Sequence, residues 1–201
     1  MAKIGLNNFR YGILTSDTTA GPVYGGAKKP AAAINCTVSI TRNNARLFAD
    51  DHLQESDNTF QSGTVNAGID RNDLQTQADL LGHSYTDGKL VRNVNDIAPN
   101  VGFGRVVVQM KDNVRSFLVE MLKKVKFGEP SQEDNTKGEN LQFGTYALEG
   151  EVAVLENGEW SDAKEFTTHD AAIAYLEEQL GGAEEAEEPA EPAEPAEPAE
   201  P

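Results

Sequence analysis

The chain has 201 residues and a formal net charge of −16 at neutral pH. Its single cysteine, Cys36, excludes an intrachain disulfide, and no apolar run approaches the roughly 18 residues that a membrane-spanning helix needs. The acidic balance argues against phosphate binding as the main activity, because that activity requires clustered Lys and Arg. The opening segment lacks the continuous apolar stretch of a signal peptide, so we expect folding in the cytoplasm.

Two segments with a period of two predict half-buried strands in the first third of the chain. In residues 34–41 the inward positions are Ile34, Cys36, Val38 and Ile40, and the outward positions are Asn35, Thr37, Ser39 and Thr41. The second segment, residues 64–70, repeats the pattern with Val65, Ala67 and Ile69 inward.

A long polar connection, about residues 42–63, separates these two strands and contains the aromatic residues Phe48 and Phe60. Compact domains rarely keep so long a connection without structure unless it has a function. We therefore expect a projecting arm or an extended hairpin.

The middle of the chain predicts a short helix and further strands. Asn72 or Asp73 caps the helix, Leu74, Ala78 and Leu81 line its apolar side, and Gly82 ends it. Strands are expected at 90–94 and 101–110. A turn at Asp112-Asn113 then leads into a regular strand over 114–127, whose fourteen residues exceed a usual strand and predict a bulge or a bend.

The last part of the body predicts strands at 141–149 and 151–155, followed by a hairpin at Asn157-Gly158 and a strand that ends near Phe166. A helix follows, with Thr168 as N-cap, an apolar stripe and Gly181 as terminator. The stripe consists of Ala172, Ile173, Leu176 and Leu180. The pattern as a whole indicates a mainly β domain with two helices, a sandwich or a small barrel.

Residues 183–201 differ sharply from residues 1–182. They contain eight Glu and five Pro in an Ala-Glu-Pro repeat, without Lys or Arg, so they carry half of the net charge. Such a segment cannot bury apolar surface, and we expect a disordered acidic tail that acts as a solubilising spacer. Deleting it should spare assembly of the body.

No catalytic, metal or cofactor site is expected. His52, His83 and His169 are scattered without metal-ligand spacing, and Cys36 falls on the apolar face of its strand. The Gly102-Phe103-Gly104 motif lacks the third glycine and the following helix of a dinucleotide site. The sequence therefore predicts a protein that is not an enzyme.

The many strands imply sheet edges with unpaired backbone groups, which monomeric proteins usually protect. Head-to-tail pairing of such edges closes into a ring when the rotation between copies allows it. Strands of separate copies would then form one barrel, with their polar faces toward a water-filled lumen.

Several segments of residues 1–180 together resemble the major tail proteins of phages, the tail tube subunits of long flexible-tailed phages. The segments that carry the resemblance are MAKIGLNNFRYGILT, YGGAKKPAAAINCTVSI, LFADDHLQESDNTFQSGTV, ADLLGH, DIAPNVGFGR, VKFGEPSQEDNTKGENLQFGT and GEWSDAKEFTTHDAAIAYL. The acidic tail lies outside it.

The resemblance implies a tail-tube-type β-sandwich or barrel over 1–182 with a flanking helix. It implies hexameric rings that stack into a hollow tube, through which DNA leaves the virion without being bound specifically. The implied partners are further copies of the chain, the tape measure protein, the tail terminator and the distal tail proteins, with assembly in the host cytoplasm. An N-terminal arm, about residues 1–30, and the loop at 42–63 are expected to contact the neighbouring ring.

Two sets of residues follow from this interpretation. The expected inter-subunit contacts lie in the loop at 42–63 and in a second polar loop at 130–140. They are Phe48, Asp50, Asp51, Phe60, Pro130, Ser131, Gln132, Glu133 and Asn135. The expected lumen residues are Asn35, Thr37, Ser39, Thr64, Asn66 and Asp70.

Two alternatives stay open. One is a tube protein of a related injection machine, such as a contractile tail, a tailocin or a type VI secretion system. The other is an acidic β binding module that presents its arms to a partner protein.

Overall fold

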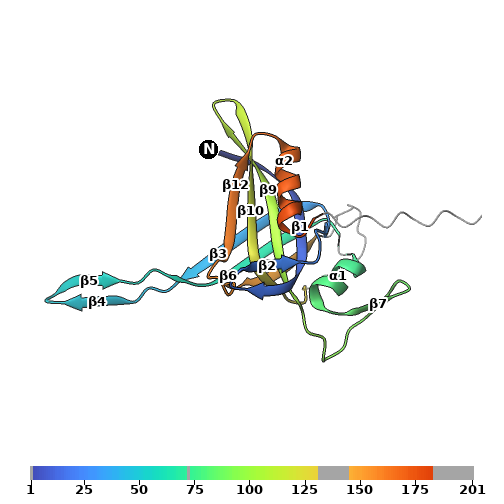
Figure 1. Ribbon diagram of the computed structural model, residues 1–201, viewed down its shortest axis with the longest axis horizontal. Helices are drawn as coiled ribbons and strands as arrows, with labels where there is room; N and C mark the ends of the chain where they lie inside the picture. Colours follow the sequence, from blue (N-terminus) through green and yellow to red (C-terminus); the bar gives the residue numbers. More distant parts are fainter. Residues whose placement is uncertain (1, 72, 131–144, 183–201) are drawn as a thin grey trace, which may run out of the picture.

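The computed structural model describes residues 2–71, 73–130 and 145–182, and within them the chain is mainly β, as predicted (Figure 1). The strands are β1 (Ala2–Thr18), β2 (Gly21–Tyr24), β3 (Ala33–Arg42), β4 (Arg46–Ala49), β5 (His52–Ser56), β6 (Phe60–Ile69), β7 (Ser84–Thr86), β8 (Lys89–Val91), β9 (Asn100–Lys111), β10 (Val114–Phe127), β11 (Tyr146–Val152) and β12 (Ser161–Phe166). The helices are α1 (Leu74–Leu81) and α2 (His169–Gln179).

The main sheet has the strand order β2-β1-β9-β10-β11-β6-β3, with β12 also on β10, and its neighbours pair antiparallel. The strands β11 and β12 follow one another along the same edge of β10, opposite residues 125–127 and 117–122 respectively. Both strands run in the same direction, antiparallel to β10, and a loop separates them. The Asn157-Gly158 turn lies in that loop and does not reverse the chain, so the predicted hairpin is wrong.

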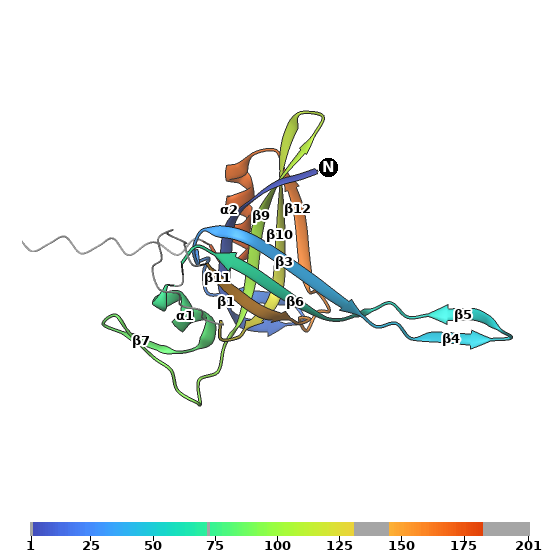
Figure 2. The same ribbon diagram turned by 180° about the vertical axis from the view of Figure 1, so that it is seen from behind.

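The sheet curls so that β3, β6 and β11 cross over β1, β9 and β10 (Figure 2). The space between these layers holds the main core, in which the ring of Phe103 contacts Phe9 and Phe127 at centroid distances of 5.2 and 5.6 Å. Inward residues of β6, β9, β10 and β11 fill the rest, including Val65, Ile69, Val101, Val125 and Leu148. The predicted alternation of apolar residues therefore builds the core.

Helix α2 covers the other face of β1, β9 and β10 (Figure 1), where Leu176 and Leu180 are fully buried. Three glycines let the helix approach. A Cβ at Gly102 would lie 2.8 Å from Leu180 Cδ2, a Cβ at Gly12 would lie 2.9 Å from the Leu180 carbonyl oxygen, and a Cβ at Gly104 would overlap Leu176 Cδ1. In the Gly102-Phe103-Gly104 motif, the two glycines thus form the surface on which α2 packs, and Phe103 points to the opposite side of the sheet, into the main core.

A bulge in β10 lets this strand contribute side chains both to the main core and to the second apolar cluster, which lies under α2. The register against β9 shifts between Leu122 and Val125. Before the shift Val119 and Met121 pack under α2, and after it Val125 and Phe127 enter the main core. The bulge predicted from the length of this strand is confirmed. The preceding turn is also confirmed, with Asp112 and Asn113 both at positive φ.

The N-terminal segment, predicted as an arm over about residues 1–30, instead contributes two strands of the sheet. β1 lies between β2 and β9 and pairs with β9 from Ala2 to Ile13. Phe9 and Tyr11 are buried in the main core, with a register shift at Asn8, whose φ is +49°. Burial of these apolar side chains and pairing with β9 make this segment part of the sheet and not a free arm.

Smaller differences concern ends of elements. Ile34 is exposed because a register shift between Ala33 and Asn35 removes it from the apolar face of β3. In α1 Leu80 is buried while Leu74 is exposed. The strand predicted at 90–94 ends at Val91, and the strand predicted at 141–149 begins, within the described residues, at Tyr146.

Candidate functional site

The three histidines, which are the side chains best suited to acid–base catalysis, lie far from one another in the structure. His52 lies in β5 of the projecting hairpin, His169 is the first residue of α2 and contacts Asn8, and His83 lies between Asp96 and Glu129. No cluster of three or more His, Cys, Asp or Glu residues suited to a metal ion occurs in the described parts of the chain.

Cys36 faces the inside of the curled sheet and accepts a hydrogen bond from Arg105 Nη1 at 3.1 Å. Arg105 also pairs with Glu120 across the β9–β10 register. Burial raises the pKa of the Cys36 thiol, and the nearby Arg105 opposes the rise only in part. A protonated, half-buried thiol is a poor nucleophile, as expected for a residue of the core.

The most prominent feature of the surface is the arm, which we define as residues 43–59, between β3 and β6. It projects from the sheet as one antiparallel ribbon (Figures 1 and 2), continued from β3–β6 by backbone bonds from Asn43 N to Thr59 O and from Asp57 N to Ala45 O, both 2.8 Å. At about 3.3 Å per residue, its tip lies about 26 Å beyond Arg42. The predicted projecting hairpin is confirmed.

The root of the arm is fixed by Asp57. Its carboxylate accepts hydrogen bonds from Thr59 N at 3.0 Å and from Asn43 Nδ2 at 2.6 Å. The bond from the Thr59 backbone is the main reason why the pKa of Asp57 is lowered. The arm therefore leaves the sheet in a defined direction.

The tip of the arm combines exposed apolar and acidic side chains. β4 and β5 join through a tight turn in which Asp50 and Asp51 both have positive φ, 50° and 60°. Behind this turn Leu47, Phe48 and Leu53 are 58%, 63% and 52% exposed. An isolated two-stranded hairpin is marginally stable in water, and these apolar side chains find no cover within the described part of their own chain.

The other expected contact residues fall elsewhere. Phe60 is half buried and stacks on Trp160, with centroids 4.9 Å apart. Pro130 is buried. Ser131, Gln132, Glu133 and Asn135 lie outside the described residues.

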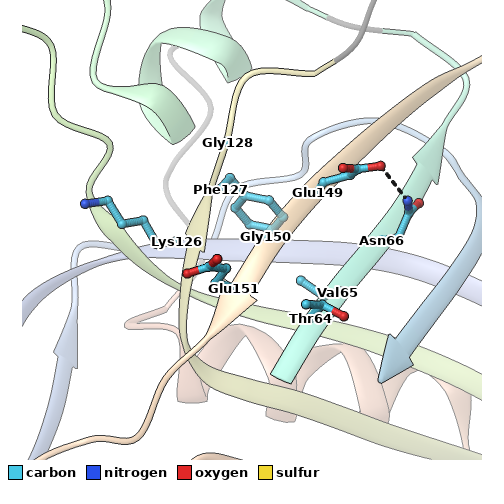
Figure 3. Close-up of a pocket in the computed structure, with 9 residues that line it drawn as sticks. All are labelled: Thr64, Val65, Asn66, Lys126, Phe127, Gly128, Glu149, Gly150 and Glu151. Atoms are coloured by element: carbon cyan, nitrogen blue, oxygen red, sulfur yellow. Dashed lines mark hydrogen bonds between the residues drawn. The ribbon is translucent and has the colours of Figure 1, made fainter. Parts of the chain in front are cut away.

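A polar surface, which we call the polar face, covers the side of β3, β6 and β11 that points away from the main core. In register across these strands lie Thr37, Asn66 and Glu149, and beside them Ser39, Thr64 and Glu151. The Asn66 amide donates to Glu149 Oε1 at 3.1 Å. Figure 3 shows part of this face, an open depression of about 610 Å³ that Lys126 of β10 also borders.

Two of the six expected lumen residues also make local hydrogen bonds. Asp70 Oδ1 accepts a hydrogen bond from Ala32 N at 2.9 Å, and Asn35 Oδ1 accepts one from Gly68 N at 3.2 Å. Sequence reasoning missed Glu149 and Glu151. The alternation in YALEGEV, with Leu148, Gly150 and Val152 inward, was the pattern that could have found them.

The curled sheet is open between β3 and β12. Among the described strands, β3 pairs only with β6 and β12 only with β10, so each leaves one edge without a partner. A cavity of about 200 Å³ lies between them, lined by Val38, Ile40 and Trp160 among others. These are edges that another strand could extend.

No model of a known protein family matches this chain, and no curated protein is significantly similar to it. Within the described residues, no helix has the length and apolar character required to cross a bilayer.

Proposed function

We propose that this protein is a structural subunit that assembles with copies of itself into stacked rings, forming the tail tube of a phage. The observation that carries the proposal is the arm. An ordered ribbon that projects about 26 Å and ends in three exposed apolar side chains is costly for a monomer, because exposed apolar groups and isolated hairpins are both unfavourable in water. Contact with another copy removes both costs.

The open edges support lateral assembly. In the proposed ring, the free edge of β3 pairs with an edge of the neighbouring copy, so that the β3–β6–β11 layers of all copies form one closed wall. Closure removes the unpaired backbone groups at these edges. The resemblance suggests six copies per ring.

The polar face suits the inner wall of such a tube. Thr37, Ser39 and Thr64 present neutral hydroxyl groups, while Glu149 and Glu151 add negative charge. Phosphate groups in transit are repelled by these carboxylates, which outnumber Lys126, the one lysine among the residues that line the depression on this face, so DNA passes without being held. The tape measure, terminator and distal tail proteins that the resemblance implies are the proposed further partners.

Electron microscopy of the concentrated full-length protein tests the proposal. We expect hollow tubes from the parent chain, whereas Phe48→Asp, which changes an exposed residue, should give a folded protein that does not polymerise. Val114→Asp, at another exposed apolar position, is the matched control and should still form tubes.

A parent protein that stays monomeric in sedimentation at every concentration, even with other tail proteins added, would contradict self-assembly and favour the binding module. A sheath around the tubes in the native particle would instead assign the chain to a contractile machine.

A further inference from the structure

The loop between β11 and β12 contains the single Asn-Gly pair of the sequence, Asn157-Gly158. Both residues are exposed. Glycine has no Cβ, so nothing on this residue hinders the approach of its backbone nitrogen to the Cγ atom of the preceding asparagine. The space around Gly158 is also open, since even an added Cβ would meet no heavy atom within 4 Å beyond its chain neighbours. The pair is therefore accessible to a reaction between side chain and backbone.

The side chain of Asn157 is held over the peptide that follows it. Its Oδ1 accepts a hydrogen bond from Glu159 N at 3.0 Å. A side chain that bonds to the backbone two residues further on folds across the intervening residue, which here is Gly158. The same bond withdraws electrons from Cγ and stabilises the negative charge that develops on Oδ1 when a nucleophile adds there.

The amide nitrogen of Asn157 is held as well. Nδ2 donates to Glu159 Oε2 at 3.0 Å, and the same carboxylate oxygen contacts Lys123 Nζ. The bond from Lys123 is the main reason why the pKa of Glu159 is lowered, and the bond from Asn157 comes next. The ionised carboxylate therefore fixes the orientation of the amide, with its oxygen toward Glu159 N.

We propose that Asn157 is a site of spontaneous modification, at which the side-chain amide is replaced by a carboxylate. The nitrogen of Gly158 gives up its hydrogen bond to Leu155 O and its proton, and forms a bond to Cγ of Asn157. The bond from Cγ to Nδ2 breaks, and Nδ2 leaves with a proton as ammonia. Water then opens the cyclic imide at either of its carbonyl groups, which gives aspartate or isoaspartate. The reaction consumes water, releases ammonia and requires no oxidant or cofactor.

The modification weakens an anchored loop. In aspartate the new carboxylate faces Glu159 Oε2, to which the amide donated, so that attraction becomes repulsion. Isoaspartate also adds a carbon atom to the main chain. The loop is fixed on both sides of this position, because Glu156 N donates to Asp17 Oδ1 and Trp160 stacks on Phe60. We expect the longer main chain to displace Trp160 from Phe60, where the arm begins.

Peptide mapping of the folded, full-length protein tests the modification after incubation in mildly alkaline buffer. We expect the peptide that contains Asn157 to gain the mass of the change from amide to acid, and to separate into aspartate and isoaspartate forms. Asn113 is the internal control. It also lies in an exposed turn at positive φ, but Val114 follows it, so it should keep its amide.

Two results would overturn this proposal, and neither depends on assembly. One is an Asn157 amide that survives in the folded protein while the same chain unfolded in urea loses it, because the turn would then protect the residue. The other is equal loss at Asn113 and Asn157. The variant Asn157→Gln, whose longer side chain does not form the five-membered imide, should keep its amide under the same conditions.

Fluorescence tests the effect on the loop, because Trp160 is the single tryptophan of the chain. The emission of the incubated parent should shift to longer wavelength as isoaspartate accumulates. Asn157→Gln, incubated in the same way, should keep its initial emission. Converted parent protein with unshifted emission would show that Trp160 stays on Phe60 and would overturn the displacement.

Discussion

The rings of Phe60 and Trp160 stack at a centroid distance of 4.9 Å and an interplanar angle of 19°. Phe60 begins β6 at the root of the arm, and Trp160 directly precedes β12. The pair therefore joins two parts of the sheet across its open side and attaches the arm to the body.

Replacing Phe60 by alanine should destabilise the fold by about 2 kcal/mol, through lost burial and the lost aromatic contact. The emission of Trp160 should shift to longer wavelength, and this is directly readable because the chain has a single tryptophan. Urea unfolding followed by fluorescence measures both effects. Phe48→Ala, at the exposed tip, is the matched control and should change neither quantity in the monomer.

Gly104→Ala should displace α2, because the added Cβ meets Leu176, a fully buried residue of the helix. We expect a loss of about 1–3 kcal/mol in the free energy of unfolding, typical of overpacking. Gly5→Ala in β1 is the control, since its Cβ would make an ordinary contact of 3.6 Å with Val108. Equal urea midpoints for the two variants would contradict the conclusion that α2 can pack on the sheet only if residue 104 is glycine.

The Asp17 carboxylate accepts hydrogen bonds from Lys124 Nζ at 2.7 Å and from Glu156 N at 3.1 Å. The bond from Lys124 is the main reason why the pKa of Asp17 is lowered. The ionised carboxylate therefore stabilises the folded state above the ordinary aspartate pKa, and this contribution disappears as the pH falls through the lowered value.

Asp17→Asn should accordingly lower stability most at neutral pH, and its difference from the parent should shrink below about pH 4. Urea midpoints measured at several pH values give this difference. Lys124→Met, which removes the donor, should reproduce the profile. A difference in urea midpoint between variant and parent that grows as the pH falls would contradict the predicted direction of the pH dependence.

The polar face can be tested in assembled particles. Glu151→Lys places a cation beside Thr64 on this face, and, if the face lines the tube, DNA ejection should slow because phosphate is attracted to it. Glu178→Lys, an equal charge change on the exposed side of α2, should leave the ejection rate at the parent value. Equal rates for both variants would place the polar face elsewhere.

Much of the fold could be predicted from the sequence because period-two alternation determines which residues are buried. The bulge of β10 followed from its length, and the arm followed from the length and polarity of its segment. The wrong assignments have a common cause. Asn157-Gly158 forms a turn locally, but the pairing of β11 and β12 with β10 decides the path of the chain, and tertiary pairing of this kind is absent from local sequence.

The candidate site was less predictable for the same reason. Thr37 and Asn66 could be placed on one face from their own strands, but Glu149 joins them only through the pairing of β11 with β6. Phe60 and Phe48 look alike as aromatic residues of a polar segment. Only the position of Trp160, a hundred residues away in the chain, distinguishes the half-buried Phe60 from the exposed Phe48.

The continuity of the arm with β3 and β6 has a mechanical consequence. A pull on the tip travels along both covalent strands and enters the sheet where β6 pairs with β11 from Gly63 to Ile69. Ladder hydrogen bonds run perpendicular to the strands, so this force shears them all together and does not open them one at a time. A filament joined through such arms would bend and stretch without shedding its subunits.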